Sequence, residues 1–173
     1  HFVCNDSEFE RHTISVEVDE QTLREVYLLP FQIAIEKSSP WTIMSAYNRI
    51  NGVYACSHDE LLNQVLKQEW GFEGLVISDW FAAKETLENA LGGLDLEMPG
   101  PSRVWGDALR EAVTDDLVPV SVLDDKVRRL LRVLQWSGRL DSPTEAPERS
   151  VDIAGHRAVA YQTAVEGMVL LKN

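Results

Sequence analysis

The sequence predicts an α/β fold made of parallel βα units, and specifically part of a (β/α)8 barrel. Three observations lead to this prediction. Short apolar runs alternate with stretches of helical periodicity, which is the pattern of βα units. Four strand signals, near residues 2, 43, 76 and 96, are half of those that a complete barrel needs. The 173 residues also fall short of the roughly 250 of a complete barrel, and the chain begins and ends in strand-like patterns. We therefore expect a fragment, since half a barrel leaves two sheet edges open.

The first predicted unit joins a strand near Phe2 to a long helix. Asp19 is placed to cap this helix, and apolar residues from Leu23 to Ala34 recur on one face of it. Pro30 lies inside the helical pattern, so we expect it to kink or end the helix, because proline cannot donate the backbone hydrogen bond.

Three further strands are expected over residues 41–46, 75–77 and 94–98. Asn51-Gly52 predicts a turn after the first of these. Ser57 to Glu60 has the pattern of a capping box, which predicts a helix from there to Gly71. A shorter helix that ends at Gly92-Gly93 leads into the last strand.

Beyond residue 100 the pattern changes to helices. Apolar stripes predict one helix over 103–113 and another from a second capping box at Ser121 to Gly138. Residues 141–150 (DSPTEAPERS) have the polar, proline-containing composition of a linker, and a helix over 152–166 and a strand over 168–173 follow. The expected domains are a barrel half with trailing helices over 1–140, a linker over 141–150 and the start of a second domain over 151–173.

Composition excludes several classes of partner. The net charge of −12 argues against nucleic acid, because binding to a phosphate backbone requires lysine and arginine. The basic residues Lys126, Arg128, Arg129 and Arg132 share one helix, and we interpret them as a solvated face. No apolar run approaches the roughly 18 residues of a membrane span. Cys4 and Cys56 lack metal-ligand spacing, so both are expected to be buried apolar residues, and no metal site is predicted.

Asp79 is the leading candidate for a functional residue. In parallel α/β folds the working side chains follow the carboxyl ends of strands, where Asp79-Trp80 and Tyr47 lie. A carboxylate directly after an apolar strand is costly to desolvate unless it is hydrogen-bonded or used. The indole of Trp80 offers an apolar face to the C–H surface of a sugar, and Tyr47 could donate to the carboxylate. These residues predict a sugar site, although position alone also allows Asp79 to cap the following helix.

The other candidates are weaker. His1 lies on an apolar strand, where a buried structural histidine and a functional one are both possible. His12, His58 and His156 are expected to be solvated, and a Glu8–Arg11 ion pair is expected to close a structural loop.

A set of motifs follows in order along the chain: HFVCN (1–5), LREVYLLPF (23–31), MSAYN with NG (44–48 and 51–52), EWGF (69–72), GLVISDW (74–80), GLDLEMPG (93–100) and VLLKN (169–173). With these motifs the chain resembles glycoside hydrolase family 3, and in particular its β-glucosidases. The family motif around HFVCN also has a preceding lysine, which is absent here. The resemblance implies that residues 1 to about 100 are the last four βα units of the barrel and that an α/β sandwich domain begins after about residue 151.

The resemblance also implies roles for residues in this chain. Asp79 matches the catalytic nucleophile, and Trp80 matches an aromatic wall of the sugar subsite. Tyr47 matches a tyrosine beside the nucleophile, Met44 a residue lining the site, and His1 a histidine that binds sugar hydroxyls. The expected reaction is retaining hydrolysis of small β-glucosides or oligosaccharides without a cofactor. The acid/base glutamate, the other barrel half and most of the second domain would lie outside the 173 residues, so we expect the isolated chain to be inactive.

Three alternatives remain open from the sequence. A β-xylosidase would share the scaffold, and a carbohydrate-binding relative without catalysis would share the sugar site. A helical adaptor built on residues 101–136 would leave the SDW, MSAYN and HFVCN motifs scattered.

Overall fold

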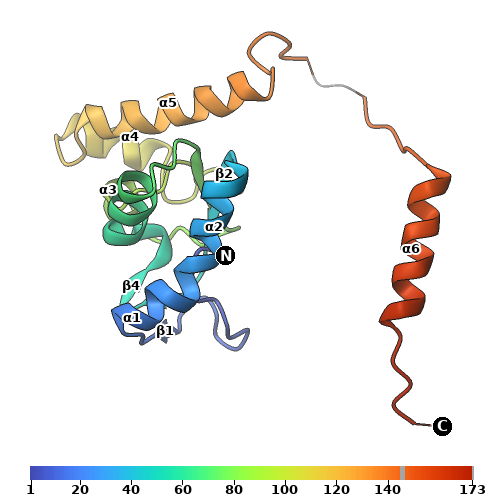
Figure 1. The fold of residues 1–173 in the computed structure, drawn as a ribbon. Helices are drawn as coiled ribbons and strands as arrows, with labels where there is room; N and C mark the ends of the chain where they lie inside the picture. The colour runs from blue at the N-terminus through green and yellow to red at the C-terminus, as the bar shows by residue number, and fades with distance from the viewer. Residues whose placement is uncertain (145–146, 173) are drawn as a thin grey trace. The chain divides into compact units, whose positions relative to one another are not determined.

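The computed structural model describes residues 1–144 and 147–172 and divides into two compact units, 1–142 and 143–173. Unit 1 is an α/β structure, as the sequence predicts. Figure 1 shows α5 (Val120–Trp136) running across one side of this unit, next to α3 (Thr86–Leu91) and α4 (Asp107–Thr114).

Parallel pairing of short apolar segments forms the centre of unit 1. Strands β2 (Thr42–Ser45) and β5 (Leu75–Ser78) pair in parallel, with Ser45 opposite Ser78. Phe2 bridges to Ser45 on one side and Leu96 bridges to Ile77 on the other, both in parallel. The strands predicted near residues 2 and 96 thus form only single bridges, whereas those predicted near residues 43 and 76 form β2 and β5. Each segment is short and largely apolar, as expected for strands that helices cover on both faces.

A second, small sheet was not predicted. Its strands are β1 (Ser15–Val16), β3 (Arg49–Ile50) and β4 (Val53–Tyr54). The predicted turn at Asn51-Gly52 joins β3 to β4, and both of its residues have positive φ, 48° and 89°. The Asn51 side chain also bonds to the backbone N–H and C=O of Val18, so it ties β1 to this hairpin.

The first helix does not break at Pro30. It comprises α1 (Glu20–Thr22), the π-helical segment η1 (Leu23–Leu28) and α2 (Leu29–Ser38), and Asp19 caps its start as predicted. Pro30 occupies the first turn of α2, directly after η1, where the hydrogen-bonding pattern already changes. A proline is tolerated in a first turn, so the helix continues to Ser38 and ends before Ser39, which has φ of 45°.

Neither predicted capping box forms. After the short 3-10 turn η2 (Ala55–Ser57), the helix η3 (Glu60–Glu69) begins without a side-chain cap, because the Ser57 hydroxyl bonds to the side chain of Asn89 at 2.7 Å instead. Helix α5 likewise begins after Pro119 with no side-chain cap, although Ser121 was expected to supply one. The predicted stops at Gly71 and Gly138 are confirmed by their positive φ.

Of the four basic residues of α5, Arg128 is solvated as predicted and pairs with Asp124, but the other three face the protein, which corrects the sequence interpretation for them. Lys126 is buried and donates to the carbonyl of Leu94 at 2.5 Å. Arg129 donates to the carbonyls of Phe72 and Gly74, and Arg132 to that of Glu73. These carbonyls precede β5 or the Leu96 bridge, and no hydrogen bond from a neighbouring strand reaches them within the described part of the chain. The side chains of α5 therefore satisfy backbone acceptors that would otherwise be left unpaired.

Unit 2 contains one helix, α6 (Ala154–Gly167), close to its predicted range. The predicted linker is neither helix nor strand over 147–150, and residues 145 and 146 lie outside the described part. The predicted strand over 168–173 does not form in 168–172, because no described segment pairs with it, and Asn173 lies outside the described residues.

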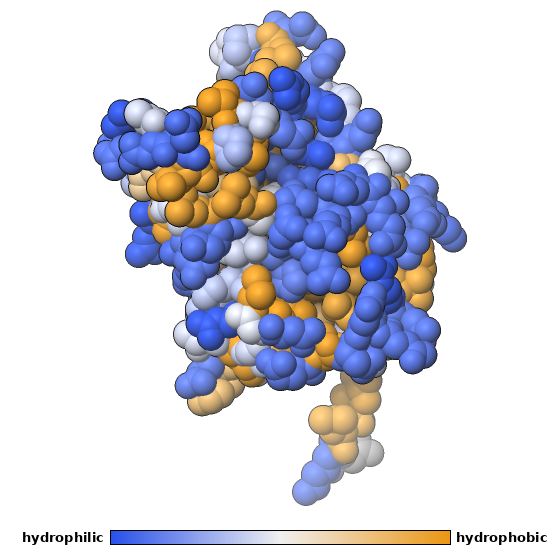
Figure 2. Space-filling view, turned by 90° about the vertical axis from the view of Figure 1, so that its left-hand side faces the viewer, coloured by the Kyte–Doolittle hydropathy of each residue, from blue (hydrophilic) through white to orange (hydrophobic). Residues whose placement is uncertain are grey.

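Buried apolar side chains of unit 1 form the core, with Phe2, Leu28, Ile50, Leu62 and Leu66 nearly inaccessible. Cys4 and Cys56 belong to this core, as predicted, and burial raises the pKa values of their thiols to about 12 and about 11. The face shown in Figure 2 mixes hydrophilic side chains with hydrophobic patches. Among the described helices, none combines the length and the apolar character needed to cross a bilayer.

A buried ion pair gives a test of this packing. Lys67 and Asp95 lie 2.7 Å apart with side chains only 6% and 0% exposed. Lys67→Met leaves the carboxylate of Asp95 buried without its cation, which we expect to lower the free energy of unfolding by about 3–5 kcal/mol. Urea unfolding of the protein measures this. Lys37→Met on the exposed end of α2 is the matched control and should change stability little. Equal effects of the two substitutions would contradict the burial argument.

Lys126 gives a pH-dependent test. Burial lowers its pKa from 10.5 to about 8, and the charges around it are Asp95, Lys67, Asp125 and Arg129. Between those two pH values the unfolded chain holds more protons than the folded chain, so the contribution of Lys126 to stability rises with pH across this window. We expect the unfolding free energy of the protein, relative to that of Lys126→Met, to increase from pH 8 to pH 10. Parallel pH curves for the two proteins would show that Lys126 titrates normally.

Candidate active site

Asp79 lies immediately after β5, at the carboxyl end of the paired strands. Its backbone N–H donates to the carbonyl of Ser45 at the end of β2, at 3.0 Å. The residue is 9% exposed, so its carboxylate is mostly withdrawn from solvent. The next helix, α3, begins only at Thr86, and no side chain caps it. Asp79 is therefore not a helix cap, which removes the structural alternative that its position left open.

Three donors from three segments hold the carboxylate of Asp79. The hydroxyl of Tyr47 donates to Oδ1 at 3.0 Å, and the backbone N–H of Trp80 donates to the same oxygen at 2.6 Å. Nε2 of His1 lies 2.7 Å from Oδ2. His1 Nδ1 is also 3.5 Å from the amide nitrogen of Asn5, so a neutral ring protonated at Nε2 satisfies both contacts. These donors fix the carboxylate in one orientation.

Tyr47 keeps its proton under this arrangement. Burial and the hydrogen bond to Asp79 raise the pKa of the Tyr47 hydroxyl. The phenol therefore serves as a hydrogen-bond donor to the carboxylate of Asp79.

Not all of the predicted site residues contact Asp79. His1, Tyr47 and Trp80 gather at Asp79, and the indole of Trp80 is 60% exposed beside it. Met44 lies on β2 opposite Ile77 and is half-buried, and the contacts that hold Asp79 do not include its side chain.

Sequence reasoning missed two residues that hold Tyr47. The guanidinium carbon of Arg11 lies 4.7 Å from the centre of the Tyr47 ring, and the ring of His12 meets it edge-on at 4.2 Å. The expected ion pair between Arg11 and Glu8 is present at 3.1 Å, but it belongs to a loop that reaches the site. His12 is exposed, as predicted, and partial desolvation with the cations Lys84 and Arg11 lowers its pKa. In the sequence, only the short distance of Arg11 and His12 from the strand near Phe2 could have indicated that they lie close to the site.

Glu97 organises the loop over residues 102–105. Burial alone would raise its pKa, but hydrogen bonds from the Ser102 hydroxyl and from the backbone N–H groups of residues 103, 104 and 105 lower it. This loop carries Arg103, whose guanidinium carbon lies 4.8 Å from the centre of the Phe81 ring. Glu97 is therefore a loop anchor.

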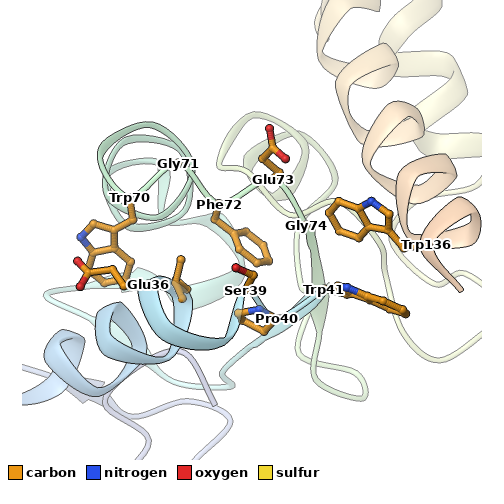
Figure 3. Close-up of a pocket in the computed structure, with 11 residues that line it drawn as sticks. Glu36, Ser39, Pro40, Trp41, Trp70, Gly71, Phe72, Glu73, Gly74 and Trp136 are labelled. Atoms are coloured by element: carbon orange, nitrogen blue, oxygen red, sulfur yellow. The ribbon is translucent and has the colours of Figure 1, made fainter.

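No cluster of side chains suited to a metal ion occurs among the described residues. A pocket of about 350 Å³ lies at the opposite end of the strands, just before β2 and β5. Figure 3 shows Trp41, Trp70, Phe72 and Trp136 around it. Its lining includes none of the residues that surround Asp79.

Comparison with known proteins gives a consistent set of relatives. Residues 1–133 match the family model described as "Glycosyl hydrolase family 3 N terminal domain". Over its whole length the chain is 45% identical to "Probable beta-glucosidase J" of Emericella nidulans and to "Beta-glucosidase" of Rhizobium radiobacter. It covers 20% and 21% of these two proteins, so it spans about a fifth of the length of the curated relatives it matches.

Solved structures agree with these matches. The whole chain superposes on 25% of beta-glucosidase 3B from Thermotoga neapolitana in complex with glycerol, with a TM-score of 0.87 and 39% identity. It also superposes on 22% of the beta-glucosidase from Kluyveromyces marxianus in complex with glucose, with a TM-score of 0.88 and 34% identity.

Proposed function

Because the chain belongs to glycoside hydrolase family 3, we propose that it is part of a longer retaining β-glucosidase that releases terminal, non-reducing β-D-glucosyl residues, with Asp79 as the nucleophile. The observation that carries this proposal is the carboxylate of Asp79, which three donors hold at the carboxyl end of β5 beside an exposed indole. The names of the relatives support the choice of substrate.

The proposed reaction has two steps. The carboxylate of Asp79 attacks the anomeric carbon, the bond from that carbon to the leaving oxygen breaks, and an acid protonates this oxygen. Water then cleaves the ester between the sugar and Asp79, and the conjugate base of the same acid takes the proton of the water. Retention requires the second carboxyl group at about 5–5.5 Å from the first. We propose that this acid/base is a glutamate outside the 173 residues.

Each residue around Asp79 has a part in this reaction. The hydrogen bonds from Tyr47 and His1 stabilise the carboxylate before attack and again as it leaves the sugar in the second step. His1 would also bind sugar hydroxyls. Trp80 presents its exposed face to the C–H surface of the sugar, and Met44 would line the same subsite. The reaction needs no metal or organic cofactor.

We propose a place for the chain in the whole enzyme on the basis of the family resemblance, and the parallel pairing of its strands supports it. Residues 1–140 would be the second half of a (β/α)8 barrel with trailing helices, 141–150 a linker and 151–173 the start of a second α/β domain. The partners of the chain would then be the other barrel half and the second domain of the same protein, and the substrate a small β-glucoside or oligosaccharide. The isolated chain would be inactive, because both the acid and half of the barrel are absent.

Removal of the nucleophile tests the mechanism. In the full-length protein, Asp79→Asn should lower kcat/KM for an aryl β-glucoside at least about 10⁴-fold, because an amide cannot form the glycosyl ester. Asp115→Asn on the exposed end of α4 is the matched control and should retain activity. A 2-deoxy-2-fluoro-glucoside with a good leaving group should add the mass of one 2-deoxy-2-fluoroglucosyl group to the peptide that contains Asp79.

Two results would overturn this proposal. Normal turnover by Asp79→Asn would exclude Asp79 as the nucleophile, and absence of labelling in an active protein would exclude the covalent step. Comparison of aryl glucoside with aryl xyloside distinguishes a β-xylosidase, and binding of glucosides without turnover or labelling identifies a carbohydrate-binding relative.

A further inference from the structure

Phe81 has a backbone conformation that its side chain disfavours. Its φ is 66°, in the left-handed region that glycine adopts without cost and that a bulky residue rarely adopts. Strain of this kind persists at functional sites when the surrounding structure enforces it. Here the N–H of Phe81 donates to the carbonyl of Met98, and the N–H of Ala82 donates to the carbonyl of Asp79, so the turn after the candidate nucleophile is closed on both sides.

Packing does not explain why a phenyl ring occupies this position. The side chain of Phe81 is 44% exposed and is not part of the core. Glycine would satisfy the same backbone geometry and would leave less apolar surface in water. Packing against the described residues therefore gives the ring no evident stabilising role, and its place two residues after the candidate nucleophile favours a role in binding.

Arg103 covers part of this ring and keeps its donors available. Its guanidinium carbon lies 4.8 Å from the ring centre, a cation–π distance, and it forms no ion pair with a described carboxylate. The four hydrogen bonds that Glu97 accepts from residues 102–105 hold the loop that carries Arg103. A fixed guanidinium with free N–H groups is suited to bind a carboxylate through two parallel hydrogen bonds.

Two further cations lie around this turn, although the chain as a whole has a net charge of −12. Lys84 donates to the carbonyl of Phe81, and Arg11 lies on the other side of Tyr47. The nearby carboxylates have partners of their own, since Glu8 pairs with Arg11, Glu97 with its loop, and Asp79 with Tyr47 and His1. An anionic group bound at Arg103 therefore meets a guanidinium that no described carboxylate pairs with.

We propose that Trp80, Phe81 and Arg103 form the binding site for the leaving group, and that this aglycone site takes a planar aromatic ring carrying a carboxylate. The ring lies against the exposed aromatic side chains, and the guanidinium of Arg103 pairs with the carboxylate. The inference rests on the function proposed above, because it needs a sugar bound at Asp79.

Charge selectivity is the first test, in the full-length protein. The probes are 4-carboxyphenyl and 4-carbamoylphenyl β-D-glucosides, which have nearly the same shape and differ in charge. Arg103→Gln should lower the ratio of kcat/KM for the acid to kcat/KM for the amide by roughly 10- to 100-fold, the range expected for loss of hydrogen bonds to a charged group. Arg110→Gln on the exposed face of α4 is the matched control and should leave the ratio unchanged. An unchanged ratio for Arg103→Gln would overturn the proposal.

Phe81→Gly separates a binding role from a structural one. We expect this variant to unfold at the same or a higher urea concentration, because the left-handed strain is removed. It should nevertheless lose kcat/KM for both aryl glucosides relative to methyl β-D-glucoside. Lower stability with an unchanged aryl-to-methyl ratio would assign Phe81 a structural role and overturn the site.

Labelling distinguishes failure of this inference from failure of the proposed function. 2-Deoxy-2-fluoro-β-glucosyl fluoride has a leaving group too small to occupy the aglycone site. The proposal expects Arg103→Gln to lower the acid-to-amide ratio of kcat/KM and to leave the rate at which this reagent labels Asp79 unchanged. Both results together support the aglycone role of Arg103. Normal labelling without any acid preference refutes the aglycone site alone, whereas absence of labelling refutes both.

Discussion

The position of Asp79 depends on the register of the parallel strands. Ser45 lies opposite Ser78 at the end of the β2–β5 pair, and Phe2 bridges to Ser45 from the other side. In the sequence, His1 precedes Phe2, Tyr47 follows Ser45 by two residues, and Asp79 follows Ser78. The strand register therefore brings all three to one edge of the sheet. Successive side chains of a strand point to opposite faces, and a slip of one residue would therefore separate the donors from the carboxylate.

The opposite end of the same strands is organised by side chains that contribute to folding. Carbonyls at residues 72–74 accept from Arg129 and Arg132, and the Leu94 carbonyl accepts from Lys126. Gly74 leaves no room for a side chain there, since a Cβ would lie 2.3 Å from the carbonyl of Trp41. These contacts anchor α5 where each strand begins, so the edge that holds Asp79 is left free of the helix. The division matches the general separation of stability from chemistry in parallel α/β folds.

The sequence predicts those features that local pattern determines. The apolar runs identified the strands β2 and β5, Asp19 and the glycines marked helix ends, and the rule for strand ends selected Asp79, Tyr47 and Trp80. Failures arose where a side chain has a distant partner. The Ser57 hydroxyl bonds to Asn89 instead of capping a helix, and the cations of α5 reach carbonyls more than thirty residues away in sequence. Such pairings depend on tertiary packing, which local periodicity does not encode.

The same limit explains why the loop over residues 5–14 was interpreted as structural. Its ion pair between Glu8 and Arg11 is local and therefore predictable, but the contacts of Arg11 and His12 with the Tyr47 ring arise only when the loop folds back over the strand ends. These contacts lie against the ring whose hydroxyl donates to Asp79, so the loop packs on a residue of the site. The hydrogen bond to Asp79 thus depends on the loop as well as on the strand. A loop that supports a donor in this way has a structural and a functional role at once, and its sequence shows only the first.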